Sequence, residues 1–277
     1  MKDAVIVSLL SLTPRKRGAR TMGWFARTKA SRMMVRLFIR TYGVDVSEAE
    51  FPLAAYPTLE ALFTRKLRAG ARPIHDAPAA IVSPVDGMVA FVGRTTGGLV
   101  EVAPGRPTTI AHLLDEPFDG ERDCVVIYLS PKDYHRVHVP REGAVVRWRY
   151  VPGTLWPVFP AAVRRVKKLF EKNERVAVRF DTDHGPLDVV LVGAFGVGRI
   201  TLSFCDLVTN SGGKAIVGEP HPRPELARGD ELGVFHLGST VVLVAPPGRW
   251  RFTVAKGDRV RVGVPLGEAT PLLTSVG

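Results

Sequence analysis

Residues 239–245 read Ser239-Thr-Val-Val-Leu-Val-Ala245, an apolar run that begins directly after Leu237-Gly238. Short valine-rich runs bounded by turn residues predict buried β-strands. Comparable β-branched runs recur between Gly, Pro and Asp residues after Pro73. They are Gly87–Gly93, Cys124–Leu129, Val145–Tyr150, Val176–Phe180, Val189–Val192, Trp250–Val254 and Arg259–Val264. The sequence therefore predicts an α+β fold with a β-rich, barrel-like or sandwich core.

The basic residues are concentrated near the N-terminus. Of the 277 residues, 38 are Lys or Arg and 27 are Asp or Glu, for a net charge of +11. Residues 1–40 contain ten basic groups and one acid, so +9 of this charge lies there and the remainder of the chain is nearly neutral. A basic arm on a neutral body favours an anionic partner, either phospholipid headgroups or nucleic acid.

Helical periodicity is strongest in the N-terminal part. Between Trp24 and Tyr42, apolar and basic residues interleave at helical spacing, which predicts one basic amphipathic helix. Such a helix can lie on an anionic bilayer, or it can pack on the body with a solvated basic face. A second helix is predicted from about Leu59 to Leu67, with Thr58 as its N-cap. The basic stretch Ala161–Lys172 fits either a helix or a mobile loop.

Several classes of protein are disfavoured. Cys124 and Cys205 have no second Cys or His at ligand spacing, so we expect neither a zinc site nor a disulfide framework. No apolar run reaches the roughly 18 residues of a spanning helix. The longest candidate, Ala4–Leu12, is followed by the basic cluster Arg15-Lys16-Arg17, whereas a secretory signal places its charge first. We therefore expect neither export nor membrane spanning.

The densest group of polar residues surrounds His135 and His138. Two histidines three residues apart point to roughly opposite faces of a strand, and Val137 and Val139 favour a strand here. A chelating pair is therefore not expected. One histidine acting as acid or base with the other in support is one interpretation, and two structural histidines are the alternative.

Asp86 and Ser239 are the other candidates for chemistry. Asp86 lies in the turn Ser83-Pro-Val-Asp-Gly87, and an Asp-Gly turn is most often structural. Ser239 follows Gly238, so its hydroxyl either caps a strand after a glycine turn or is a nucleophile beside an unshielded carbonyl. Taken singly, these residues do not decide between a structural and a catalytic role.

Taken in order, eight segments resemble the phosphatidylserine decarboxylase family, and they cover most of the chain. They are Phe63-Thr-Arg-Lys-Leu67 with Ala71-Arg-Pro-Ile74, Ser83-Pro-Val-Asp-Gly87, Asp133-Tyr-His-Arg-Val-His-Val-Pro140, Pro152-Gly-Thr-Leu155, Asn173-Glu-Arg-Val176, Val192-Gly-Ala194 with Val197-Gly198, Gly229-Asp-Glu-Leu-Gly-Val-Phe235 and Leu237-Gly-Ser-Thr240. Each segment alone is weak, but eight in this order are specific.

The resemblance implies a proenzyme that cuts itself between Gly238 and Ser239. In the family, the serine hydroxyl attacks the preceding glycine carbonyl, and elimination followed by hydrolysis leaves a pyruvoyl group in place of the serine. Carried over, this yields residues 1–238 and 239–277 as a heterodimer whose covalent cofactor derives from Ser239. His138 matches the base that activates the serine, Asp86 matches the supporting carboxylate, and Asp133 is a second candidate carboxylate.

The resemblance also implies the reaction. The pyruvoyl group forms a Schiff base with phosphatidylserine, CO2 leaves, and hydrolysis releases phosphatidylethanolamine. His135 matches the proton donor, with His138 as its rival, and no metal or diffusible cofactor is required. A lipid substrate makes the anionic bilayer, and not nucleic acid, the expected partner of residues 1–40.

These implications divide the chain into two regions. We expect residues 1–58 to form a basic amphipathic membrane-docking region and residues 59–277 to form a β-rich catalytic domain. The protein would then be peripheral, on the cytoplasmic side of the cell membrane.

Two other classes remain as rivals. A serine hydrolase could use the same residue types on an external ester or peptide, but the chain lacks a Gly-x-Ser-x-Gly elbow around Ser239. A non-enzymatic carrier or lipid-binding module is the second rival, and the carrier version lacks an acceptor lysine beside Met88. Both rivals predict one intact polypeptide.

Overall fold

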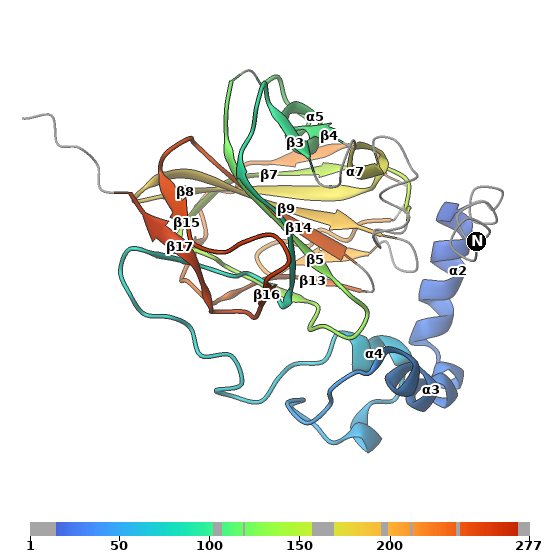
Figure 1. Ribbon diagram of the computed structural model, residues 1–277. Coiled ribbons are helices and arrows are strands. Elements are labelled where there is room, and N and C mark those ends of the chain that lie inside the picture. Colours follow the sequence, from blue (N-terminus) through green and yellow to red (C-terminus); the bar gives the residue numbers. More distant parts are fainter. Residues whose placement is uncertain are drawn as a thin grey trace, which may run out of the picture.

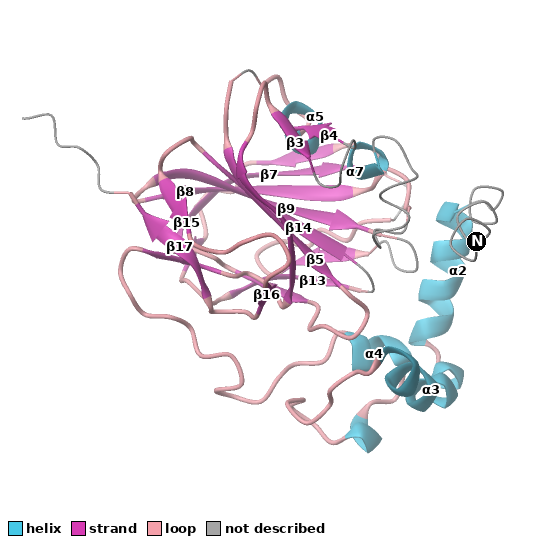
Figure 2. Ribbon diagram, viewed as in Figure 1, coloured by secondary structure: helices cyan, strands magenta, loops and turns pink. Residues whose placement is uncertain are grey.

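The computed structural model describes residues 15–101, 107–118, 120–156, 169–194, 199–210, 213–236 and 239–270. Figure 1 shows a β-rich body with three helices grouped at one end of it. The separation of helices from strands is plain in Figure 2, where the helical group is joined to the body through long loops. The predicted α+β fold with a β-rich core is confirmed.

The body is built on a nine-stranded antiparallel sheet. Its strands follow the order β11-β7-β8-β9-β14-β5-β2-β16, and β12 pairs with β7. They are β2 (Gly87–Arg94), β5 (Asp123–Leu129), β7 (Gly143–Val151), β8 (Arg175–Thr182), β9 (Gly185–Gly193), β11 (Ile216–Gly218), β12 (Glu225–Leu226), β14 (Ser239–Ala245) and β16 (Arg259–Val260). The path has two ends and does not close, so the core is an open layered structure and not a closed barrel.

Smaller sheets complete the described body. One is ordered β10-β13-β6, a second is ordered β1-β17-β15, and β3 and β4 form a two-stranded pair beside two short helices. Their bounds are β1 (Ala80–Val82), β3 (Leu99–Glu101), β4 (Pro107–Thr109), β6 (Arg136–His138), β10 (Ile200–Leu202), β13 (Glu231–Phe235), β15 (Trp250–Phe252), β17 (Pro265–Ala269), α5 (Ile110–Leu114) and α7 (Leu169–Lys172).

Strand β14 lies at the centre of the large sheet, between β9 and β5. All seven of its residues are buried, and alternate side chains enter two different cores. Val241 and Leu243 belong to the core shared with the smaller sheets, whereas Val242 and Val244 belong to the core beneath α5. Ser239 lies two residues before Val241, on the same face of β14, so its side chain faces the smaller sheets.

The helical group consists of α2 (Arg15–Arg27), α3 (Arg32–Tyr42) and α4 (Leu59–Phe63), with 3-10 turns at Lys29–Ser31 and Leu53–Ala55. The prediction of one helix from Trp24 to Tyr42 is wrong, because the chain breaks at Thr28. Thr28 has an extended backbone, and its hydroxyl donates to the Phe25 carbonyl at 2.7 Å. The Ser31 hydroxyl donates to Ala26 and accepts from the Leu59 backbone N–H, which fixes the turn against α4.

Helix α4 begins as predicted, since the Thr58 hydroxyl accepts from the Ala61 backbone N–H at 3.1 Å. It ends at Phe63, four residues earlier than predicted. None of the described helices is long and apolar enough to cross a membrane. The stretch Ala161–Lys172 lies outside the described residues except for its last four, which form α7.

The C-terminal strands are shorter than predicted. β15 ends at Phe252 and β16 ends at Val260. The chain turns after β16, where Gly263 has a φ of +85° and the Val264 N–H donates to the Arg261 carbonyl. A side chain at Gly263 would also collide with the Pro73 carbonyl oxygen. This turn brings Arg261 and Val262 beside the Asp86 turn.

Candidate active site

Ser239 is the first residue of β14 and is completely buried. Its backbone lies opposite Gly193 of β9 and Leu129 of β5. Within the part of the chain that the structure describes, its Oγ has no hydrogen-bond partner. A buried hydroxyl without a partner costs free energy, so it calls for a chemical explanation. Gly238, the other side of the predicted cleavage site, lies outside the described residues.

His135 directly precedes β6 and is 1% exposed. Its Nδ1 is 2.8 Å from the Asp133 carbonyl oxygen, which can only accept, so Nδ1 carries the hydrogen. Its Nε2 is buried without a partner among the described residues, and the ring packs on Phe63 with centroids 4.0 Å apart. Burial lowers the pKa of His135 to about 3, so the imidazole is neutral at physiological pH.

His138 is held differently, at the end of the same strand. Its Nδ1 donates to the Gly229 carbonyl at 2.7 Å, which leaves Nε2 as the acceptor. The Tyr134 hydroxyl lies 3.2 Å from that Nε2 and can donate to it. Burial lowers the pKa of His138, and the negative charges of Glu231 and Asp86 oppose this effect more weakly. His138 is therefore a neutral imidazole with its basic nitrogen at Nε2.

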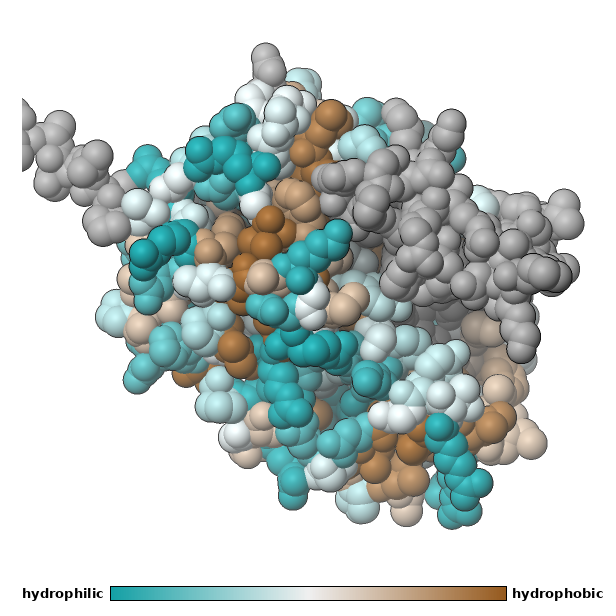
Figure 3. All heavy atoms as spheres, viewed as in Figure 1, coloured by the Kyte–Doolittle hydropathy of each residue, from teal (hydrophilic) through white to brown (hydrophobic). Residues whose placement is uncertain are grey.

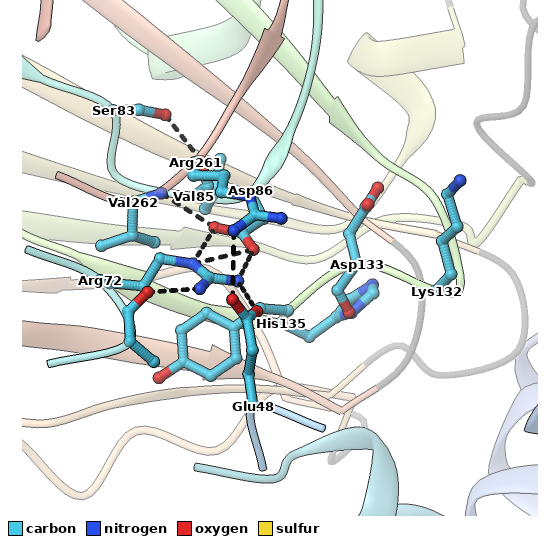
Figure 4. Close-up of polar contacts among 12 residues, drawn as sticks. Glu48, Arg72, Ser83, Val85, Asp86, Lys132, Asp133, His135, Arg261 and Val262 are labelled. Atoms are coloured by element: carbon cyan, nitrogen blue, oxygen red, sulfur yellow. Dashed lines mark hydrogen bonds and ion pairs between the residues drawn. The ribbon is translucent and has the colours of Figure 1, made fainter. Parts of the chain in front are cut away.

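Asp86 is bound by arginine. The Arg72 guanidinium donates from Nε to Oδ1 at 3.0 Å and from Nη2 to Oδ2 at 2.6 Å, and the Val262 backbone N–H donates to Oδ1 at 2.9 Å (Figure 4). Arg72 also donates to Glu48 at 2.9 Å. Burial alone would lower the pKa of Arg72, but the hydrogen bonds to these two carboxylates raise it. Arg72 therefore stays charged.

This arrangement gives the His138 imidazole a different partner from the one expected. The resemblance implies that Asp86 supports His138, but the His138 Nδ1 binds the Gly229 carbonyl, while the Asp86 carboxylate is bound by Arg72. The planar guanidinium matches both carboxylate oxygens, so this pairing is strong and directional. Asp86 acts on His138 through space and not through a hydrogen bond in the described structure.

Asp133 contacts His135 through its backbone and binds other groups with its side chain. Its carboxylate accepts from the Ser130 backbone N–H at 2.7 Å and from Arg259 at 2.5 Å. Its carbonyl oxygen accepts the Nδ1 hydrogen of His135 at 2.8 Å. Asp133 therefore shapes the loop before β6 and fixes the tautomer of His135.

Two polar groups near these residues have no predicted role. Arg72 lies within Ala71-Arg-Pro-Ile74, but nothing in the sequence shows that it pairs with Asp86, fourteen positions away. His236, three residues before Ser239, contacts Arg199 and Glu60. Because Glu60 belongs to α4, this contact ties the helical group to the segment that precedes Ser239.

The described groups define a class of protein. A buried serine without a partner among the described residues, one buried and one half-buried neutral imidazole, and an arginine-held carboxylate are the components of an enzyme with serine-centred chemistry. Comparison with known proteins narrows this class, since the sequence profile of the family described as phosphatidylserine decarboxylase matches residues 59–268.

Individual relatives span almost the whole chain. A phosphatidylserine decarboxylase proenzyme from Anaeromyxobacter sp. (strain K) is 41% identical over 97% of this chain and 100% of its own length. One from Myxococcus xanthus is 36% identical over 98% and 100%. One from Halorhodospira halophila is 45% identical over 84% of this chain and 82% of its own. The chain belongs to the phosphatidylserine decarboxylase family.

Proposed function

We propose that the chain is a proenzyme that cuts itself between Gly238 and Ser239 and then decarboxylates phosphatidylserine to phosphatidylethanolamine. The observation that carries the proposal is the buried Ser239 hydroxyl, which has no partner in the described structure although it lies within the central strand. Relatives across almost the full length are named phosphatidylserine decarboxylase proenzymes, which supports the same reading. The products are residues 1–238 and 239–277.

In this proposal, His138 is the base for the serine. Its Nε2 holds a lone pair, and burial keeps the imidazole unprotonated at neutral pH. To accept the Ser239 proton, Nε2 must lose its contact with the Tyr134 hydroxyl and accept a hydrogen bond from the Ser239 hydroxyl instead. The imidazolium that forms is stabilised at a distance by Asp86, whose charge Arg72 and the Val262 N–H hold in place.

The pyruvoyl group derived from Ser239 would supply an electrophilic carbonyl that binds the substrate amine and takes up the electron pair of the breaking bond to the carboxylate. The position fits this group, because the serine side chain is enclosed and has no hydrogen-bond partner among the described residues to lose on conversion. His135 is the proposed proton carrier. Asp133 holds its Nδ1, so its Nε2, which has no partner among the described residues, is the atom that would take up a proton from solvent and deliver it to the substrate α-carbon from which CO2 leaves.

Intact mass spectrometry of the freshly purified protein tests the proposal. We expect two polypeptides, residues 1–238 and a fragment beginning at position 239 whose blocked end resists sequencing by Edman degradation. We also expect phosphatidylserine decarboxylation that hydroxylamine abolishes, because hydroxylamine captures ketone carbonyls. A single chain of full mass that is active would rule the proposal out. Activity of that chain on esters would favour the alternative hypothesis of a serine hydrolase.

The helical group is the proposed membrane-docking surface. Arg32, Arg36 and Arg40 recur every four residues along α3 and are exposed. Met33 is 81% exposed and Leu37 is 60% exposed on the same helix. Figure 3 shows hydrophobic and hydrophilic side chains side by side at the lower right, over the helical end of the molecule. Apolar side chains beside arginines suit the boundary of an anionic bilayer.

Point substitutions test this docking without dismantling the helices, whose small core includes Val35 and Leu62. Replacing Met33 and Leu37 together by serine should weaken sedimentation with phosphatidylserine-containing vesicles by about tenfold or more, because two apolar side chains no longer enter the bilayer. The matched control replaces the exposed Val208 and Val217 by serine. Equal vesicle binding by both double variants would refute docking through α3.

A further inference from the structure

A cavity of about 470 Å³ lies between the helical group and the body. Its lining includes Gly43, the residue after α3, together with the candidate site residues Asp86 and Asp133. The cavity therefore lies beside the end of α3 and beside two of the candidate site residues. Its volume falls within the range of small-molecule sites.

Some of the charged residues that line this cavity form ion pairs with one another, and others do not. Three of its arginines bind its carboxylates: Arg72 binds Asp86 and Glu48, Arg259 binds Asp133, and Arg261 binds Glu48. The remaining carboxylate, Asp45, is exposed and accepts from the Ser47 backbone N–H. Arg65 and Lys132 also line the cavity, and neither forms an ion pair with any described residue.

Arg65 is an unusual residue to leave without an anion. It is 5% exposed, and the only described hydrogen bonds of its guanidinium are long ones to the carbonyls of Leu62, at 3.5 Å, and Lys132, at 3.4 Å. Its Nε has no partner among the described residues. Burial lowers the pKa of Arg65, and Tyr56 and the carboxylates of Asp86 and Asp45 oppose this only through space. A buried guanidinium is stabilised when an anion accepts its hydrogens.

Lys132 is the second cation in the cavity lining that forms no ion pair with a described residue, and it contacts Arg65. Its backbone carbonyl accepts from Arg65 Nη2, so the two residues are in contact, and its side chain is exposed. Figure 4 shows Lys132 and Asp133 next to each other on the loop that leads to His135. An anion in the cavity would therefore be close to the loop that carries the proposed proton carrier.

From these contacts we infer that the cavity binds the phosphate group of the substrate headgroup, with Arg65 and Lys132 as its cationic contacts. The inference rests on the proposed function and names the part of the protein that selects the phosphate ester. A free phosphate ion has the same chemistry, so the test must separate the two sources. The headgroup enters from the α3 side, where Gly43 borders the cavity.

Isothermal titration of the full chain with sn-glycero-3-phosphoserine, and separately with inorganic phosphate, measures this site directly. Replacing Arg65 by glutamine should weaken glycerophosphoserine binding by about tenfold or more, because a charge-assisted hydrogen bond is lost. The Lys132→Gln variant should weaken it by about threefold, since that side chain is solvated. Because Lys132 is exposed, the Lys132→Gln variant should fold normally. It therefore tests the site even if the Arg65→Gln variant does not fold.

The matched controls are Arg249→Gln and Lys256→Gln, which remove exposed cations outside the cavity lining. They should leave binding unchanged. In decarboxylation assays with dispersed phosphatidylserine, Lys132→Gln should raise KM with little change in kcat, because it removes binding and not chemistry.

The outcomes separate the two proposals. If Lys132→Gln binds glycerophosphoserine as tightly as the native chain and keeps its KM, the headgroup site is refuted, whatever the enzyme's activity. Binding of inorganic phosphate that glycerophosphoserine does not displace would also refute the headgroup assignment. If glycerophosphoserine binds and the variants weaken it while the chain is neither cleaved nor active, the cavity stands and the proposed function fails.

Discussion

Replacement of Ser239 by alanine is expected to leave a single uncut chain of 277 residues with no decarboxylase activity. The variant lacks the only atom proposed to attack the Gly238 carbonyl, and no pyruvoyl group can form. Its fold should be unaffected, because the serine hydroxyl is buried and has no described partner. Removing such a group is neutral or stabilising. Denaturing gels, intact mass and thermal unfolding measure these results.

The neighbouring residue offers a matched control. Thr240 is also buried, and its hydroxyl has no partner within the described ranges, but strand alternation turns its side chain toward the opposite core. The Thr240→Val variant should therefore still cut itself. Cleavage of Ser239→Ala at the same bond, or failure of both variants to cleave, would contradict the assignment of Ser239 as nucleophile.

Substitution of the two histidines should separate cleavage from decarboxylation. The His138→Gln variant is expected to cleave itself roughly 100- to 10,000-fold more slowly, the usual contribution of a general base. The His135→Gln variant should be cut into two chains but should decarboxylate more slowly by a similar factor, because the proton carrier is missing. Self-cleavage of the second variant also shows that it has folded. The exposed His75 supplies the control, His75→Gln.

The pH dependence of cleavage gives a second measurement on His138. A base acts only above its pKa, and burial lowers the pKa of His138 from the ordinary value of 6.5. The rate of self-cleavage of the native chain should therefore stay as it is at pH 7 while the pH falls through 6.5, and it should decline only under more acidic conditions.

One result with the two histidine variants would reverse the proposed roles. It is an uncut His135→Gln chain together with a normally cleaved His138→Gln chain.

The strands could be predicted because their signal is local. Ser239–Ala245 is a strand with the predicted bounds, and its unbroken burial follows from its position between β9 and β5. The order of the strands could not be predicted, since a run of valines fits equally well beside any neighbour. The break at Thr28 was missed for a related reason, because Ser31 holds that turn through a contact with Leu59, 28 residues away.

The sequence names candidate residues for the site, but it does not reveal their contacts. The motifs pointed to Asp86, His135, His138 and Ser239, and the family match supports the resemblance on which those residues were chosen. The partner of Asp86 was not predictable, because Arg72 reaches it only once the loop before β1 has folded across the body. The pairing of Arg65 with the Lys132 carbonyl likewise joins segments 67 residues apart.

The central position of β14 has a consequence for how the enzyme is made. Seven of its residues pair with β5 on one side and six pair with β9 on the other, and the precursor assembles this arrangement within one molecule. After the proposed cut, residues 239–277 are a separate chain that still supplies the middle strand. Refolding would then require two molecules to meet, so the order of reaction changes from first to second. The mature enzyme would persist through slow unfolding, and each copy would fold only once, as its precursor.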